Sequence, residues 1–207
     1  MADRENHKIR KIVISSRLVT TLAGSAQGAG FADGTGTGAK FNKPKGITTD
    51  GTNLYVVDKE NIKIRKIVIS SGVVTTLAGG SGVFNSPQKI TTDGTNLYVS
   101  DKYNHRIRKI VISTQAVTTL AGTGSAGSSD ATGTSASFNE PYGITSAGTS
   151  LYVADSANHK IRKIALTETE TENVALHNLD DDTDITVAVS SSDTGEATVS
   201  PATLTFT

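Results

Sequence analysis

Three Asn-His pairs are the residues in this chain that most suggest a chemical site, and they are Asn6-His7, Asn104-His105 and Asn158-His159. Imidazole nitrogen binds zinc, but a zinc site needs three or four ligands that converge on one point. Each pair occupies the same place in a repeated pattern, so the imidazoles should lie a whole repeat apart. We therefore interpret them as turn residues with local hydrogen bonds, and keep His105 and His159 as candidate ligand-binding residues.

Carboxylates in two places suggest calcium, which takes oxygen ligands. Asp33 and Asp130 lie in loops rich in Gly, Thr and Ser, whereas Asp180-Asp181-Asp182 and Asp184 form a run near the C-terminus. Neither place has the spacing of an EF-hand loop. Asp33 and Asp130 are therefore candidate binding residues, and calcium binding by the acidic run stays open as an alternative.

Several classes of catalytic site are missing from the sequence. There is no Cys, and no Ser-His-Asp set, Walker loop or Gly-rich dinucleotide motif occurs. We therefore expect a non-catalytic protein with no catalytic residue, no cofactor and no metal ion.

Arginine recurs beside lysine in four places, at Arg10, Arg65, Arg108 and Arg162. Clustered cations with aromatic side chains would favour RNA binding. Here the cations alternate with Ile, which predicts a solvated outer strand whose lysines discourage edge pairing. RNA binding is kept only as an alternative. Asp58 is expected to pair with Arg65 or with an arginine of a neighbouring blade.

The element that positions all these residues is a repeat, Asp-x-x-Asn-x-x-Ile-Arg-Lys-Ile, which begins at Asp3, Asp58, Asp101 and Asp155, in steps of 55, 43 and 54 residues. Each full repeat contains four short apolar runs separated by turn signals such as Asp50-Gly51. Four strands cannot bury both faces of their sheet alone, and radial stacking of such sheets is a β-propeller. The predicted fold class is therefore all-β. Phe41, Phe84 and Phe138 stand at matching places and should fill the core between blades.

The repeat resembles the NHL family of propellers over roughly residues 2–166. The resemblance rests on residues 44–47, 54–58 and 61–67 and on their counterparts at 141–144, 151–155 and 158–164. It departs at Lys89, where Gly46 and Gly143 stand in other copies, and at Ala147, where Asp50 and Asp93 stand. The resemblance implies a ring of about six blades. It also implies two alternative functions: RNA binding, and a metal-dependent lyase or hydrolase, for which this chain offers no channel-facing His.

The number of strands predicts an open arc of about three four-stranded blades. We expect two strands in 7–22, four in 44–78, four in 87–121 and three in 141–166. Such an arc cannot close a ring by itself. It is either part of a larger protein or a half-ring that associates with itself through its open edges.

The sequence changes character after residue 166, which predicts a domain boundary between 1–166 and 167–207. Residues 1–163 hold all 20 basic residues and 11 acidic ones, a net charge of +9, and the remainder is purely acidic. An acidic linker is followed by alternating residues that predict short sandwich strands. Residues 190–207 resemble the Calx-β-like repeats of bacterial surface proteins. The resemblance implies a large exported bacterial protein at the cell surface or outside the cell.

Three residues break the repetition at one position, directly after the Pro that opens each inner strand. They are Lys45, Gln88 and Tyr142. A framework position should repeat, whereas a position that differs is either tolerant surface or in contact with a ligand. We expect these residues, the long loops and the His turns to share one face. The predicted function is a binding or scaffold module for a protein or glycan, without membrane insertion because no apolar run is long enough.

Overall fold

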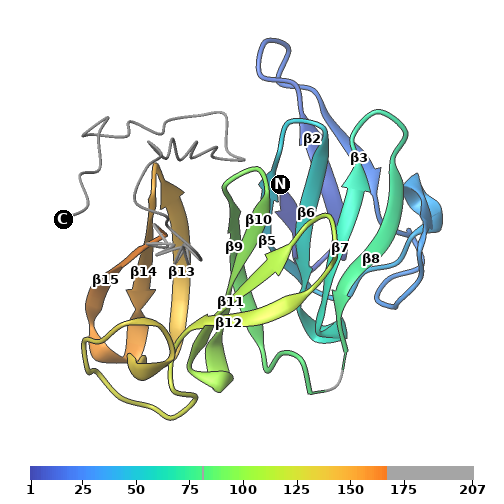
Figure 1. The fold of residues 1–207 in the computed structure, drawn as a ribbon. Coiled ribbons are helices and arrows are strands. Elements are labelled where there is room, and N and C mark those ends of the chain that lie inside the picture. Colours follow the sequence, from blue (N-terminus) through green and yellow to red (C-terminus); the bar gives the residue numbers. More distant parts are fainter. Residues whose placement is uncertain (81, 167–207) are drawn as a thin grey trace, which may run out of the picture. The chain divides into compact units, whose positions relative to one another are not determined.

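The computed structural model describes residues 1–80 and 82–166, which all lie in one compact unit, Met1–Glu168. These residues form an all-β structure of four antiparallel sheets placed side by side, a partial propeller (Figure 1). The expected acidic linker, sandwich strands and calcium site of 167–207 lie outside the described residues, so they and the domain boundary stay predictions.

The first two sheets contain more strands than the sequence predicted. The first sheet, in the order β1-β2-β3, consists of β1 (Ala2–Asp3), β2 (Lys8–Ile12) and β3 (Val19–Ala23). The second, in the order β4-β8-β7-β6-β5, consists of β4 (Gly34–Thr35), β5 (Pro44–Thr49), β6 (Asn53–Asp58), β7 (Lys63–Val68) and β8 (Val73–Gly79). The two additional strands are β1 and β4. Strand β4 forms because Gly34 and Thr35 pair with β8, and this pairing brings the long connection to the outer edge of the sheet.

The other two sheets have the predicted strand numbers. The third consists of β9 (Pro87–Thr92), β10 (Asn96–Asp101), β11 (Arg106–Val111) and β12 (Val117–Ala121). The fourth consists of β13 (Pro141–Ala147), β14 (Ser150–Asp155) and β15 (Lys160–Ala165). Single turns of 3-10 helix complete the described residues: η1 (Gly36–Gly38), η2 (Lys59–Asn61), η3 (Lys102–Asn104), η4 (Gly133–Ser135) and η5 (Ser156–Asn158). No helix among them is long and apolar enough to cross a membrane.

The hairpin between the first two strands of a sheet depends on an aspartate. Asp50 Oδ1 accepts hydrogen bonds from the backbone N–H groups of Thr52 (2.9 Å) and Asn53 (2.6 Å), and its Oδ2 accepts one from the Tyr55 hydroxyl (2.7 Å). Asp side chains stabilise turns in this way. Loss of hydration works to raise the pKa of Asp50, but these hydrogen bonds outweigh it and lower the pKa. Asp93 repeats the arrangement in the third sheet.

The turn between the second and third strands is left-handed at its last residue. His7, Ile62, His105 and His159 have φ angles of 55°, 55°, 52° and 55°. In the second sheet, the backbone of β8 passes very close to this turn at Gly79. A Cβ on Gly79 would lie 2.4 Å from the carbonyl oxygen of Ile62. Gly79 is therefore needed for this close approach and for its own positive φ.

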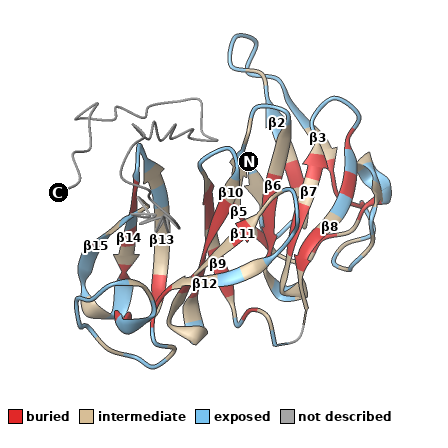
Figure 2. Ribbon diagram, in the orientation of Figure 1, coloured by how far each residue is buried: buried red, intermediate tan, exposed pale blue. Residues whose placement is uncertain are grey.

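The core lies between neighbouring sheets, as radial stacking requires. Three apolar clusters occupy the three junctions, and each contains the predicted phenylalanine: Phe41, Phe84 and Phe138, which are 0%, 4% and 1% exposed. The prediction for these three residues is confirmed. Buried positions concentrate in the middle sheets, whereas β15 is largely exposed (Figure 2).

Candidate functional site

The structure brings together the three residues that break the repetition. Lys45, Gln88 and Tyr142 are each the second residue of an inner strand, in β5, β9 and β13. The Lys45 ammonium donates a hydrogen bond to Oε1 of Gln88 and lies 4.4 Å from the centroid of the Tyr142 ring. We call these three residues the rim cluster. They meet although they come from three different sheets, because the inner strands of neighbouring sheets run side by side (Figure 1).

Backbone packing explains why the inner strands come so close. A Cβ on Gly46 would lie 2.8 Å from Cα of Lys89 in the next strand, so glycine allows the approach of β5 to β9. Between β9 and β13, the Ser100 hydroxyl donates to the carbonyl oxygen of Tyr142 (2.6 Å) and accepts from the N–H of Lys89 (3.1 Å). Lys89 replaces a glycine without changing the strand, since β9 keeps the six-residue length of β5.

The rim cluster holds a positive charge that no carboxylate neutralises. Gln88 is almost buried. Its amide nitrogen donates hydrogen bonds to the carbonyl oxygen (2.9 Å) and the hydroxyl (2.8 Å) of Ser86, and this leaves the amide oxygen of Gln88 facing Lys45. Among residues 1–80 and 82–166, no carboxylate lies within ion-pair distance of Lys45. The hydrogen bond from Lys45 lowers the pKa of Tyr142, and the charges of Lys45, Lys89 and Arg4 act in the same direction.

The rim cluster presents polar groups from three sheets at one place. It offers an ammonium group, a phenol and an amide, which are hydrogen-bonding groups for a polar or anionic ligand. Among the described residues, no three His, Asp or Glu side chains come together as metal ligands.

Two of the histidines, His7 and His105, help to hold neighbouring sheets together. Nδ1 of His105 accepts a hydrogen bond from the backbone N–H of Glu140 (3.2 Å), and Nδ1 of His7 accepts one from Lys43 (3.0 Å). The expected hydrogen bond is thus present, but it joins residues 35 or 36 positions apart rather than local ones. Lys102 reinforces the junction through an ion pair with Glu140 (2.9 Å). That His105 and His159 contact a ligand stays a prediction.

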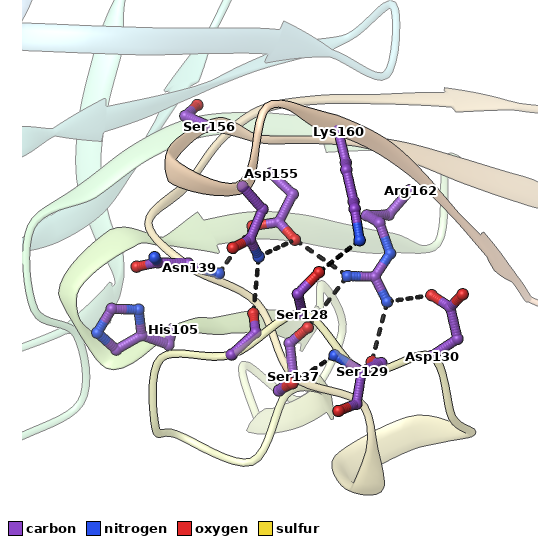
Figure 3. Close-up of polar contacts among 12 residues, drawn as sticks. His105, Ser128, Ser129, Asp130, Ser137, Asn139, Asp155, Ser156, Lys160 and Arg162 are labelled. Carbon is purple, nitrogen blue, oxygen red and sulfur yellow. Dashed lines mark hydrogen bonds and ion pairs between the residues drawn. The ribbon is translucent and has the colours of Figure 1, made fainter.

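Asp33 and Asp130 lie beside arginines at the outer side of the sheets, and their ion-pair partners are these arginines rather than residues of the rim cluster. Asp33 is paired with Arg65 at 2.7 Å and Asp130 with Arg162 at 2.5 Å, as Figure 3 shows for the fourth sheet. Their carboxylates are 49% and 93% exposed. A ligand role for either residue stays a prediction, and the structure gives each an ion pair.

Two of the four repeated arginines, Arg65 and Arg162, are buried, which corrects the expectation of a solvated outer strand for them. Arg65 and Asp58 are both fully buried and form an ion pair of 2.8 Å, and Arg162 pairs with Asp155 at 3.0 Å. The predicted Asp-Arg pairing is therefore confirmed. The prediction that these arginines are exposed was wrong because the long connections fold over them and supply carbonyl acceptors such as those of Lys40 and Ser137. The sequence signal was an Asp and an Arg in every repeat, with another Asp in each long loop.

Comparisons with known proteins agree with this geometry. No model of a known protein family matches the chain. NHL repeat-containing protein 2 of Gallus gallus is 35% identical over 79 residues, which are 38% of this chain and 11% of that protein. Protein SUPPRESSOR OF QUENCHING 1, chloroplastic, of Arabidopsis thaliana is 40% identical over 73 residues, 35% of this chain and 7% of that protein. The chain thus spans about a tenth of the length of these curated relatives.

Solved structures show the same fold at low sequence identity. A protein of unknown function from Bacteroides thetaiotaomicron superposes with a TM-score of 0.61 at 21% identity, over 78% of this chain and 42% of that one. An auxiliary nutrient binding protein from the same organism gives 0.60 at 19%, over 77% and 43%. A chain of a nidogen/laminin complex gives 0.58 at 20%, over 80% and 54%. Sequence similarity and fold together support NHL-type repeats on a propeller arc.

Proposed function

We propose that this chain is a non-catalytic binding module whose rim cluster contacts a protein or glycan ligand. The observation that carries the proposal is the meeting of Lys45, Gln88 and Tyr142, three residues that differ where their neighbours repeat. A rigid scaffold that presents variable residues on one side is a common basis of recognition. The nutrient-binding protein of similar fold is compatible with such a role.

The uncompensated charge of Lys45 favours a ligand with acidic groups. A glycan that carries carboxylates could accept hydrogen bonds from the ammonium group and from the Tyr142 hydroxyl, and a charged acceptor strengthens such bonds. Tyr142 is partly exposed, so its ring can also contact the ligand.

A glycan array that includes neutral and uronic-acid-containing sugars tests the proposal. We expect selective binding of an acidic glycan, and a loss of at least about tenfold in affinity, or about 1.4 kcal/mol, in Lys45→Ala and in Tyr142→Ala. Lys11→Ala is the matched control, since it removes an exposed lysine from the first sheet and should bind normally. Equal binding by all variants, or stoichiometric zinc or iron in the purified protein, would contradict a non-catalytic rim site.

We further propose that the parent protein is exported by a bacterium and acts at the cell surface. The support is the resemblance of residues 190–207 to Calx-β-like repeats. Protease treatment of intact cells that produce the parent protein should degrade it, whereas a cytoplasmic marker in the same cells should survive.

A further inference from the structure

Two of the repeated arginines bind a short acidic segment of their own chain. In the second sheet, Nη2 of Arg65 donates to the carbonyl oxygen of Ala32 (2.8 Å) and to Oδ1 of Asp33 (2.7 Å). Both acceptors come from consecutive residues of the long connection. The guanidinium group therefore recognises a small residue followed by aspartate.

The fourth sheet repeats this recognition. Nη2 of Arg162 donates to the carbonyl oxygen of Ser129 (3.0 Å) and to Oδ1 of Asp130 (2.5 Å), as Figure 3 shows. The two connections also share Thr-Gly-Thr and Phe-Asn after their aspartates, and in both of them the arginine binds a backbone carbonyl and the next carboxylate.

The third sheet has the arginine but lacks the acidic segment. Nη1 of Arg108 donates to the carbonyl oxygen of Val83 (3.0 Å), Nε donates to that of Thr118 (3.3 Å), and Asp101 lies 3.6 Å away. No residue in 1–80 or 82–166 accepts a hydrogen bond from Nη2 of Arg108. The connection before β9 is shorter than those before β5 and β13, and its sequence contains no aspartate.

The unfilled position is more basic than its counterparts because, among the described residues, it keeps two cations but lacks the second carboxylate. Arg106 stands two residues before Arg108 on the same side of β11, where the other sheets have Lys63 and Lys160. Its Nη2 donates to the carbonyl oxygen of Thr123 (3.2 Å). Two guanidinium groups thus face a single carboxylate, and after burial the charge of Arg106 contributes to a lowered pKa of Arg108.

We propose that Arg108, with Arg106 beside it, binds a peptide segment of a partner in which aspartate follows a small residue. The carbonyl oxygen and the carboxylate of that segment take the places that Ala32 and Asp33 occupy at Arg65. A guanidinium group binds planar carboxylates well because its donors form a rigid fork. The site is separate from the rim cluster, so either proposal can fail alone.

The test is an NMR titration of the ¹⁵N-labelled protein with the blocked peptide Phe-Ala-Asp-Gly-Thr-Gly, the sequence of residues 31–36. We expect saturable shifts of the Arg108 and Arg106 Nε–Hε signals, several-fold larger than those of Arg65 and Arg162, whose acceptors are already in place. The arginines of the filled sheets thus serve as controls within one spectrum.

Two variants and two further probes make the result decisive. Arg108→Lys should lose the shift of the Arg106 signal, and Asp33→Ala should create a second responsive site at Arg65. The same peptide with Asn in place of Asp should give no saturable shift. Equal shifts with the Asn peptide, the full effect with acetate alone, or no preference for Arg108 over Arg162 would each overturn the proposal.

Discussion

At the scale of single residues, the rim cluster is defined by one cation and its neutral partners. Lys45 is fixed by Gln88 and by the ring of Tyr142, and no ion pair neutralises it within the described residues. Its charge therefore acts on the phenol. This is why the pKa of Tyr142 is lowered, whereas burial and the hydrogen bond to Asp50 raise the pKa of Tyr55 to about 12.

Replacing Lys45 should remove the interactions that lower the pKa of Tyr142. In Lys45→Met we expect the pKa of Tyr142 to rise towards its ordinary value of about 10, because the hydrogen bond and the positive charge are both lost. An NMR titration of ¹³Cζ-labelled tyrosine measures this directly. Tyr55 is the internal control and should titrate as before, and an unchanged Tyr142 would show that the two side chains do not interact in solution.

The buried ion pairs make a second residue-scale prediction. Asp58→Ala leaves the fully buried Arg65 without its inner partner, which should lower the free energy of unfolding by about 3–5 kcal/mol. Asp33→Ala removes a half-exposed partner of the same arginine and should cost only about 1 kcal/mol or less. Asp101→Ala should fall between them, since Arg108 lies farther away and is 12% exposed. Urea unfolding gives the order, which equal losses in all three would contradict.

At the scale of elements, the hairpins of the second and third sheets depend on ionised aspartates. Because the hydrogen bonds of Asp50 lower its pKa in the folded state, its contribution is complete above the ordinary carboxyl pKa of about 3.9. The contribution is lost as the pH falls through the lowered value. Asp93 follows the same rule, since its pKa is also lowered.

Removing the charge of Asp50 should make the free energy of unfolding less dependent on pH in the acid range. We expect Asp50→Asn to lose roughly 1 kcal/mol at pH 7 and less as the pH falls below the ordinary carboxyl pKa of about 3.9, where the unfolded chain takes up a proton that the folded protein does not. Chemical unfolding at several pH values measures the difference. Ala147→Ser, in the hairpin that lacks the aspartate, should leave the pH dependence unchanged. A constant difference between Asp50→Asn and wild type at all pH values would refute the assignment.

Local sequence signals predicted the elements well and the burial of charges poorly. Asp50-Gly51 and its counterpart in the third sheet mark hairpins because their backbone bonds lie within four residues. The short strand β4 was missed because it has only two residues, one of them glycine, and these pair only when β8 is beside them. The burial of Arg65 was missed because its acceptors lie 25 to 33 residues away, in a connection whose path the sequence does not reveal.

For the rim cluster, the sequence predicted which residues matter but not how they interact. Lys45, Gln88 and Tyr142 were selected because they vary at one repeated position. Their contacts depend on how closely the inner strands approach, which Gly46 and Ser100 determine. Such distances follow from packing between sheets and cannot be inferred from strand order.

At the scale of the whole molecule, equivalent residues of the repeated sheets show which sheet faces are covered by a neighbouring sheet. Ile64 and Ile107 are completely buried in the junctions that follow their sheets. The equivalent residue of the fourth sheet, Ile161, is 73% exposed, and the adjacent Tyr152 is 39% exposed. This face matches the others in sequence and differs from them only in being uncovered among the described residues.

We therefore predict that the 207-residue chain associates with itself through this face. Ile161→Lys should weaken the association by at least about tenfold, because it places a charge where an apolar contact would form. Sedimentation velocity over a range of concentrations measures it, with Lys160→Ala as a control on the opposite face of the same strand. A monomer at every concentration would instead favour an arc that is completed by other parts of a longer protein.

The strand β4 also determines how the arc would respond to a pulling force. Its hydrogen bonds to Val73 and Val74 must break before the connection between the first and second sheets can lengthen. The connection between the second and third sheets has no such strand in its described residues, so tension there acts directly on the packing around Phe84. The arc should therefore resist extension more between its first two sheets than between the second and the third.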